Sequence, residues 1–126
     1  MCERGSIMTR EFVRLPEFEK QCNHLGLSED NIIEIEIENE IIANPAIGDL
    51  IQGTGGIRKL RIALSNRGKR SGARVIFIDF ISFSKTYLIT VYSKSKVENI
   101  SKAGRNELRK YVDTLKDELR KKEKYE

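Results

Sequence analysis

Near the start of the chain, hydrophobic residues are spaced first as in a strand and then as in a helix. Residues 9–15 mix β-forming and charged residues, which predicts a short strand that stops before Pro16. Pro16 suits the first position of a helix, and Gly26 is a typical helix end. Between these two residues, apolar side chains keep helical spacing: Phe18, Cys22 and Leu25.

Residues 33–38 alternate isoleucine and glutamate, which by itself is typical of a strand. Other signals favour a helix. Ser28 is a good N-cap followed by acidic residues in the first turn, and Asn44 with Pro45 is a helix terminator. Isoleucines also recur every fourth residue, at Ile33, Ile37 and Ile41. We therefore predict a helix of about 16 residues, since a strand typically has about 5–6.

Period-two alternation of apolar and polar residues marks the second half of the chain. Three strands are predicted, over residues 57–64, 73–81 and 86–94. The second is apolar at nearly every position, as in a strand covered on both faces. A glycine-rich stretch (48–56) precedes the three strands, and a basic loop (65–72) and a turn (82–85) join them.

The last predicted helix begins near Ser101 and carries one apolar stripe, formed by Leu108, Val112, Leu115 and Leu119. Its charged end, from Arg120 onward, is expected to fray. The order β-α-α-β-β-β-α predicts an α+β domain in which helices pack on one face of a small antiparallel sheet. We assign this domain to residues 9–120, between a flexible extension (1–8) and a charged tail (121–126).

Length and composition narrow the class of protein. The chain has 126 residues, 39% of them hydrophobic, which suits one globular domain. No apolar run approaches the ~20 residues that cross a bilayer, and charges near the start argue against a signal peptide, so we expect a cytoplasmic protein without membrane contact. Cys2, Cys22 and His24 are isolated, so neither a disulfide framework, a metal site nor a cofactor is expected.

The net charge of +4 is weak evidence for a nucleic-acid partner, but the charges are segregated along the chain. No acid lies between Asp49 and Asp79, whereas acids gather over residues 29–40. The acid-free interval holds Arg58, Lys59, Arg61, Arg67, Lys69, Arg70 and Arg74.

Strand alternation predicts where these cations meet. Lys59 and Arg61 leave the same face of one strand, Arg74 begins the next, and the third ends with Tyr92 and Lys94. An antiparallel meander would bring Lys59, Arg61, Arg74 and Lys94 onto one concave surface. Three loop residues would extend the surface: Arg67, Lys69 and Arg70.

Such a surface suits an RNA backbone, because guanidinium groups bind phosphate in a bidentate way and an aromatic side chain can stack on a base. It also suits cleavage through the ribose 2′-OH, which needs a base, cations at the phosphorane and an acid for the leaving oxygen. A lysine crowded by other cations has a lowered pKa and is a feasible base. The competing interpretation is a solvated basic surface without function. Residues 53–56 lack the ending of a phosphate-binding loop and are expected to form a tight bend.

An ordered set of motifs resembles the RelE/HigB branch of the RelE/ParE superfamily of bacterial type II toxins. The motifs are NPxxGDxIxGTGGIRKLR (44–61), GKRxGxRVI (68–76), YLIxVYxK (87–94) and ENIS (98–101). The resemblance spans residues 12–119. Residues before Met8 lie outside it, which makes Met8 an alternative start.

The resemblance implies a RelE-like fold and a ribosome-dependent, metal-independent endoribonuclease that cleaves mRNA in the ribosomal A site and stops translation. Implied partners are the ribosome, mRNA and a helix-turn-helix (HigA-like) antitoxin, with operator DNA reached only through the antitoxin. The catalytic residues implied are Lys59, Arg61, Lys94 and, in the phosphate-stabilising role, Arg74. The expected RNA contacts are Arg58, Arg67, Lys69, Arg70 and Tyr92.

The chain departs from the family pattern near its last strand. Some RelE proteins carry an arginine after the last-strand lysine, where this chain has Ser95, and a tyrosine in the closing segment, which is absent between Tyr92 and Tyr111. The general base therefore stays open between Lys59 and Lys94, and Tyr92 is either a stacking residue or part of the core. Two alternatives remain: a ParE-like gyrase poison, and a non-catalytic relative that binds RNA or antitoxin. The paired strand cations favour the nuclease.

Overall fold

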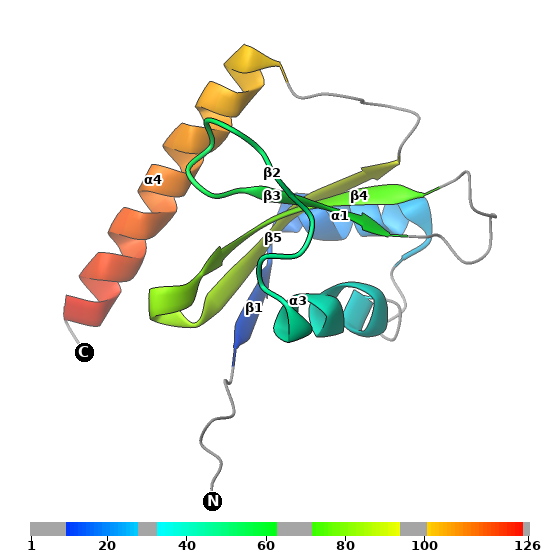
Figure 1. Ribbon diagram of the computed structural model, residues 1–126, viewed down its shortest axis with the longest axis horizontal. Coiled ribbons are helices and arrows are strands. Elements are labelled where there is room, and N and C mark those ends of the chain that lie inside the picture. The colour runs from blue at the N-terminus through cyan, green and yellow to red at the C-terminus, as the bar shows by residue number, and fades with distance from the viewer. Residues whose placement is uncertain (1–9, 28–32, 63–71, 94–100, 125–126) are drawn as a thin grey trace, which may run out of the picture.

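The computed structural model describes residues 10–27, 33–62, 72–93 and 101–124, and within them five strands form one sheet (Figure 1). The strand order is β1-β5-β4-β3-β2. Neighbouring strands pair antiparallel except β1, which runs parallel to β5. The strands are β1 (Glu11–Arg14), β2 (Asp49–Leu50), β3 (Arg58–Ile62), β4 (Ala73–Phe80) and β5 (Lys85–Ser93).

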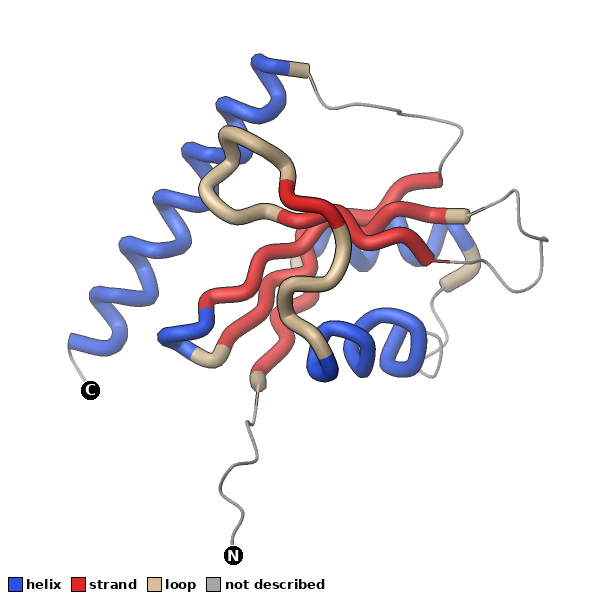
Figure 2. Tube along the Cα trace, viewed as in Figure 1, coloured by secondary structure: helices blue, strands red, loops and turns tan. Residues whose placement is uncertain are grey.

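The helices lie on both sides of this sheet, as Figures 1 and 2 show: α1 and α3 on one side and α4 on the other. Their bounds are α1 (Pro16–Leu25), α3 (Asn39–Ala43) and α4 (Lys102–Lys124). A π-helical turn, η2 (Glu34–Glu38), leads into α3, and a 3₁₀ turn, η4 (Ile81–Phe83), joins β4 to β5.

The predicted α+β class is confirmed, but the expected antiparallel sheet with helices on one face is wrong on two points. The sheet is mixed, because β1 lies along β5 in parallel. Both faces are covered, because β4 is apolar on each. Val75 and Phe77 belong to the core cluster under α1, and Ile76 and Ile78 belong to the cluster under α4. A strand that is apolar on both faces must be covered on both faces.

The first helix forms as its sequence predicts. Pro16 occupies the first turn, and Gly26 ends the helix in the left-handed region with φ 75°. Phe18 and Cys22 are fully buried under the sheet. Burial raises the pKa of the Cys22 thiol to about 11, so this cysteine is a neutral packing group rather than a nucleophile.

The isoleucine-rich segment is helical, as predicted, over the part that the structure describes. Ile33, Ile37 and Ile41 are all buried against the sheet, so the four-residue spacing decided the conformation over the local period of two. The π-helical turn at Glu34–Glu38 was not predicted. Glu38 accepts a hydrogen bond from Arg14 Nε at 2.9 Å, which fastens this turn to β1.

The remaining elements differ in part from the sequence prediction, and β4 and β5 do so by a single residue at an end. β2 was not expected at all and pairs with β3. Of residues 57–64, β3 takes Arg58–Ile62, and residues 63 and 64 lie outside the described residues. The turn over residues 82–85 contains part of η4. α4 begins after Ser101, whose Oγ accepts the amide hydrogen of Gly104 at 3.0 Å, and the helix continues to Lys124, past the point of expected fraying.

A buried ion pair attaches the start of β1 to the β4–β5 hairpin. Arg10 Nη1 lies 2.9 Å from Asp79 Oδ1, and the two side chains are only 3% and 5% exposed. The same carboxylate oxygen accepts a hydrogen bond from Thr86 Oγ1 at 2.8 Å. Across the described ranges, none of the helices combines the length and apolar character needed to cross a bilayer.

Candidate nucleic-acid interface

Lys59, Arg61 and Arg74 share the face of the sheet that α4 partly covers; we call these three residues the cationic face. Arg61 is the direct cross-strand neighbour of Arg74, and Lys59 is the neighbour of Ile76. Ile76 belongs to the core cluster under α4, which identifies the face. The predicted convergence of these three cations is therefore present in the fold.

The register places two positively charged residues, Arg61 and Arg74, directly opposite each other. Directly opposite residues of an antiparallel pair have Cβ atoms about 4.5–5.5 Å apart, and like-charged residues at such positions are destabilising. Arg61 is exposed and Arg74 half-buried. An anion bound between two guanidinium groups would turn this repulsion into attraction, and phosphate matches their planar donors.

Asp49, which sequence reasoning did not select, lies beside the cationic face. β2 places Asp49 directly opposite Lys59, so the two side chains emerge on the same face. This carboxylate is exposed and lies where it can orient the lysine ammonium. The only sequence signal was the position of Asp49 in the first motif, because the two-residue strand β2 is too short to predict from alternation.

Tyr92 is on the cationic face but is mostly part of the core. It is the cross-strand neighbour of Arg74, and its ring packs against the cluster under α4. Its hydroxyl oxygen is buried. This placement favours the core role over base stacking, the two alternatives left open by the sequence.

Arg58 is separated from the cationic face. Arg58 directly precedes Lys59 in β3, so its side chain points to the opposite face of the sheet. Its Nε donates to the carbonyl oxygen of Ile47 at 3.1 Å, and its Nη2 donates to that of Gly48 at 3.0 Å. The guanidinium therefore holds the chain between α3 and β2, on the other side of the sheet from Tyr92, the other predicted RNA contact among the described residues.

Lys94, Arg67, Lys69 and Arg70 lie outside the described residues. The two described strands that lead toward them end at Ser93 and Ile62, next to Arg74 and Arg61. Their assignments stay predictions.

The glycine-rich residues before β3 form the expected tight bend. Thr54 is fully buried at its centre, donating to the carbonyl oxygen of Ile51 at 2.7 Å and accepting from the amide of Ile57 at 3.1 Å. Earlier in the same connection, Gly48 passes so close to β3 that a Cβ there would collide with the carbonyl oxygen of Lys59. Gly48 therefore helps to fix the backbone that carries Lys59.

No imidazole belongs to the cationic face, because His24, the chain's single histidine, is exposed on α1, which packs on the other side of the sheet. Within the described residues, no three His, Cys, Asp or Glu side chains gather in a way that could hold a metal ion. No protein-family model matches the chain.

Proposed function

We propose that this protein is the toxin of a type II toxin–antitoxin system, a metal-independent endoribonuclease that cleaves mRNA in the ribosomal A site. The observation that carries the proposal is the cross-strand pair of Arg61 and Arg74 with Lys59 on the same face. Like-charged residues directly opposite each other in a sheet are destabilising, and a bound anion would offset their repulsion. The resemblance to RelE/HigB toxins supports RNA as that ligand.

The proposed reaction is attack of the ribose 2′-oxygen on the adjacent phosphorus. The new bond joins the 2′-oxygen to phosphorus, the bond from phosphorus to the 5′-oxygen breaks, and the products are a cyclic phosphate and a 5′-hydroxyl. Arg61 and Arg74 stabilise the charge of the phosphorane, which is where preorganised donors contribute most. Lys59 or Lys94 takes the 2′ proton, and a protonated group returns one to the leaving oxygen.

The proposed partners follow from the same resemblance. A helix-turn-helix antitoxin would neutralise the protein and connect it to operator DNA, and the ribosome would supply the A site in which mRNA is presented. The place of action would be the cytoplasm.

The test is brief induced expression in bacteria with three readouts: amino-acid incorporation, mapping of new mRNA 5′ ends, and an SOS reporter. We expect incorporation to stop and new ends to appear within codons of translated regions. A premature stop codon should protect the mRNA downstream of it from cleavage, because cleavage requires a translating ribosome. Intact mRNA with an SOS response would instead identify a gyrase poison, and intact mRNA with no effect on growth would identify a non-catalytic relative.

A further inference from the structure

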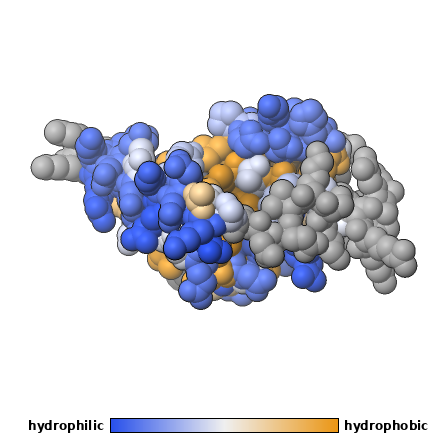
Figure 3. Space-filling view, turned by 90° about the horizontal axis from the view of Figure 1, so that it is seen from above, coloured by the Kyte–Doolittle hydropathy of each residue, from blue (hydrophilic) through white to orange (hydrophobic). Residues whose placement is uncertain are grey.

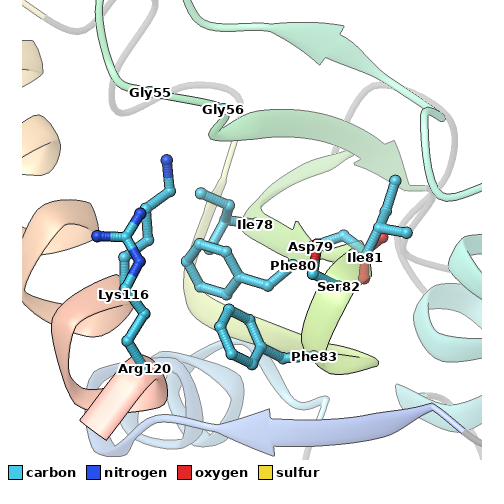
Figure 4. Close-up of a pocket in the computed structure, with 10 residues that line it drawn as sticks. All are labelled: Gly55, Gly56, Ile78, Asp79, Phe80, Ile81, Ser82, Phe83, Lys116 and Arg120. Atoms are coloured by element: carbon cyan, nitrogen blue, oxygen red, sulfur yellow. The ribbon is translucent and has the colours of Figure 1, made fainter. Parts of the chain in front are cut away.

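A pocket of about 290 Å³ lies between the C-terminal half of α4 and the end of β4 (Figure 4). It is on the same side of the sheet as Lys59, Arg61 and Arg74 but at the opposite end of β4, and none of these three residues lines it. Its apolar wall is formed by Ile78, Phe80 and Phe83. Lys116 and Arg120 project from α4 opposite these rings. We propose that this pocket binds a nucleotide, with the base against the aromatic wall and the phosphate on the two cations.

The charges of the pocket favour an anion. Lys116 and Arg120 are one helical turn apart, so their side chains share one face of α4. Lys116 is half-buried and makes no ion pair with any described residue. Arg120 has only a loose, exposed partner, Asp117, with 3.7 Å between Nη1 and Oδ1. A surface pair of this kind is worth little and is easily exchanged for a phosphate.

The acid in the pocket wall does not cancel these cations. The Asp79 side chain is 5% exposed, and its Oδ1 is paired with Arg10 Nη1 at 2.9 Å. The net charge presented to a ligand is therefore positive.

The shape of the pocket favours a flat group. Phe80 packs edge-on against Tyr87, with ring centroids 5.7 Å apart. Gly56 forms the opposite border, where a Cβ would approach the Cδ1 atom of Ile78 to 3.4 Å and narrow the space. Bases stack on aromatic rings without sequence preference. The volume is at the lower end of small-molecule pockets, which limits the ligand to about one nucleotide.

Ile81, one of the residues that line the pocket, is 72% exposed. Seen from above, the molecule is hydrophilic along α4 and has a hydrophobic area in the middle of that face, which is a different part of the surface from the pocket (Figure 3). A free nucleotide and one nucleotide of an RNA strand present the same chemistry to the pocket. Comparing a mononucleotide probe with a short RNA probe distinguishes these two ligands.

The test is an NMR titration of the full chain with AMP, adenosine and a short adenylate RNA. We expect AMP to shift the amide signals of Ile81, Phe83 and Lys116, and adenosine to bind about tenfold more weakly because it lacks the charged phosphate. If the source is an RNA strand, the adenylate RNA binds more tightly than AMP; if it is a free nucleotide, the two bind alike.

Variants decide whether the binding is at this pocket. K116A and R120A should each weaken AMP binding about tenfold, and F83L should weaken AMP while sparing inorganic phosphate. The control is K110A, which removes a 77%-exposed lysine of α4 that does not line the pocket. The nucleotide proposal is wrong if AMP shifts only the cationic face, or if K116A and R120A bind AMP as the wild type does. It is also wrong if an acidic aromatic peptide shifts the pocket and AMP does not, since the pocket would then receive a protein. R74A should leave AMP binding unchanged, so failure of the proposed cleavage and failure of this site are distinguishable.

Discussion

Arg61 on β3 lies directly opposite Arg74 on β4, so two arginine side chains leave the same face of adjacent strands. Without a ligand this pair opposes folding, because like charges directly across a sheet are destabilising. The same pair is well placed to hold a phosphate between the two guanidinium groups. Stability and function therefore make opposite demands on these two positions.

The first prediction is that R61Q and R74Q each stabilise the unliganded protein. The free energy of unfolding should rise by roughly 0.2–1 kcal/mol at low salt, and less at high salt, where the repulsion is screened. Urea unfolding of the purified variants measures this change. K110Q is the matched control: it removes an exposed lysine 3.8 Å from Glu107, so its stability should fall slightly or stay the same. Marked destabilisation by either arginine variant would show that the arginine has a structural partner.

The second prediction concerns activity. R74A should reduce mRNA cleavage by about 10²–10³-fold, the usual loss when one donor to a charged transition state is removed, and should abolish growth inhibition. K59A should reduce mRNA cleavage by a smaller factor than R74A. Both effects are measured by 5′-end mapping after induced expression, with circular dichroism to show that the fold is intact and with K110A as control. A folded R74A protein that remains fully toxic would disprove the site assignment.

The third prediction concerns the buried pair of Arg10 and Asp79. D79A should lower the free energy of unfolding by about 3–5 kcal/mol, because it leaves a buried guanidinium without its counter-charge. Replacing both residues together, R10M with D79L, should recover most of that loss, since no buried charge remains. Urea unfolding of the single and double variants gives the comparison.

E11Q is the control for this pair, because it breaks an exposed salt bridge, 2.7 Å between Lys85 Nζ and Glu11 Oε1, and should change stability little. Lys85 lowers the pKa of Glu11 by its hydrogen bond and charge. The small stabilisation from this pair is therefore present above the ordinary glutamate pKa and is lost as the pH falls through the lowered value. Equal effects of E11Q and D79A would contradict the importance of burial.

The fourth prediction compares two glycines with similar positive φ angles. Gly48 and Gly53 have φ of 85° and 82°, so alanine is strained by a similar amount at each. A Cβ at position 53 meets nothing, whereas one at position 48 collides with the carbonyl oxygen of Lys59. G53A should cost about 1 kcal/mol and keep activity, and G48A should cost more and also reduce cleavage by displacing Lys59. Thermal unfolding together with the cleavage assay separates the two; similar behaviour of G48A and G53A would mean that β3 accommodates the extra atom.

The sequence determined the elements whose signals were local. Pro16 and Gly26 set the first helix, the isoleucines at every fourth residue set the second against a competing period of two, and Ser101 set the start of α4. Alternation along β3 also put Lys59 and Arg61 on one face. Each of these conclusions depends on contacts between residues that are close in sequence or on a repeated spacing, which a single sequence contains.

Only the tertiary structure decided which residues meet. The parallel pairing of β1 with β5, the short strand β2 that places Asp49 beside Lys59, and the buried Arg10–Asp79 pair all join residues distant in the chain. The hydrogen bonds from Arg58 to backbone carbonyl oxygens and the burial of the Tyr92 hydroxyl likewise depend on packing. Residue type and spacing define what a side chain is able to bind. Its neighbours across the sheet, and its access to solvent, are set by the fold as a whole.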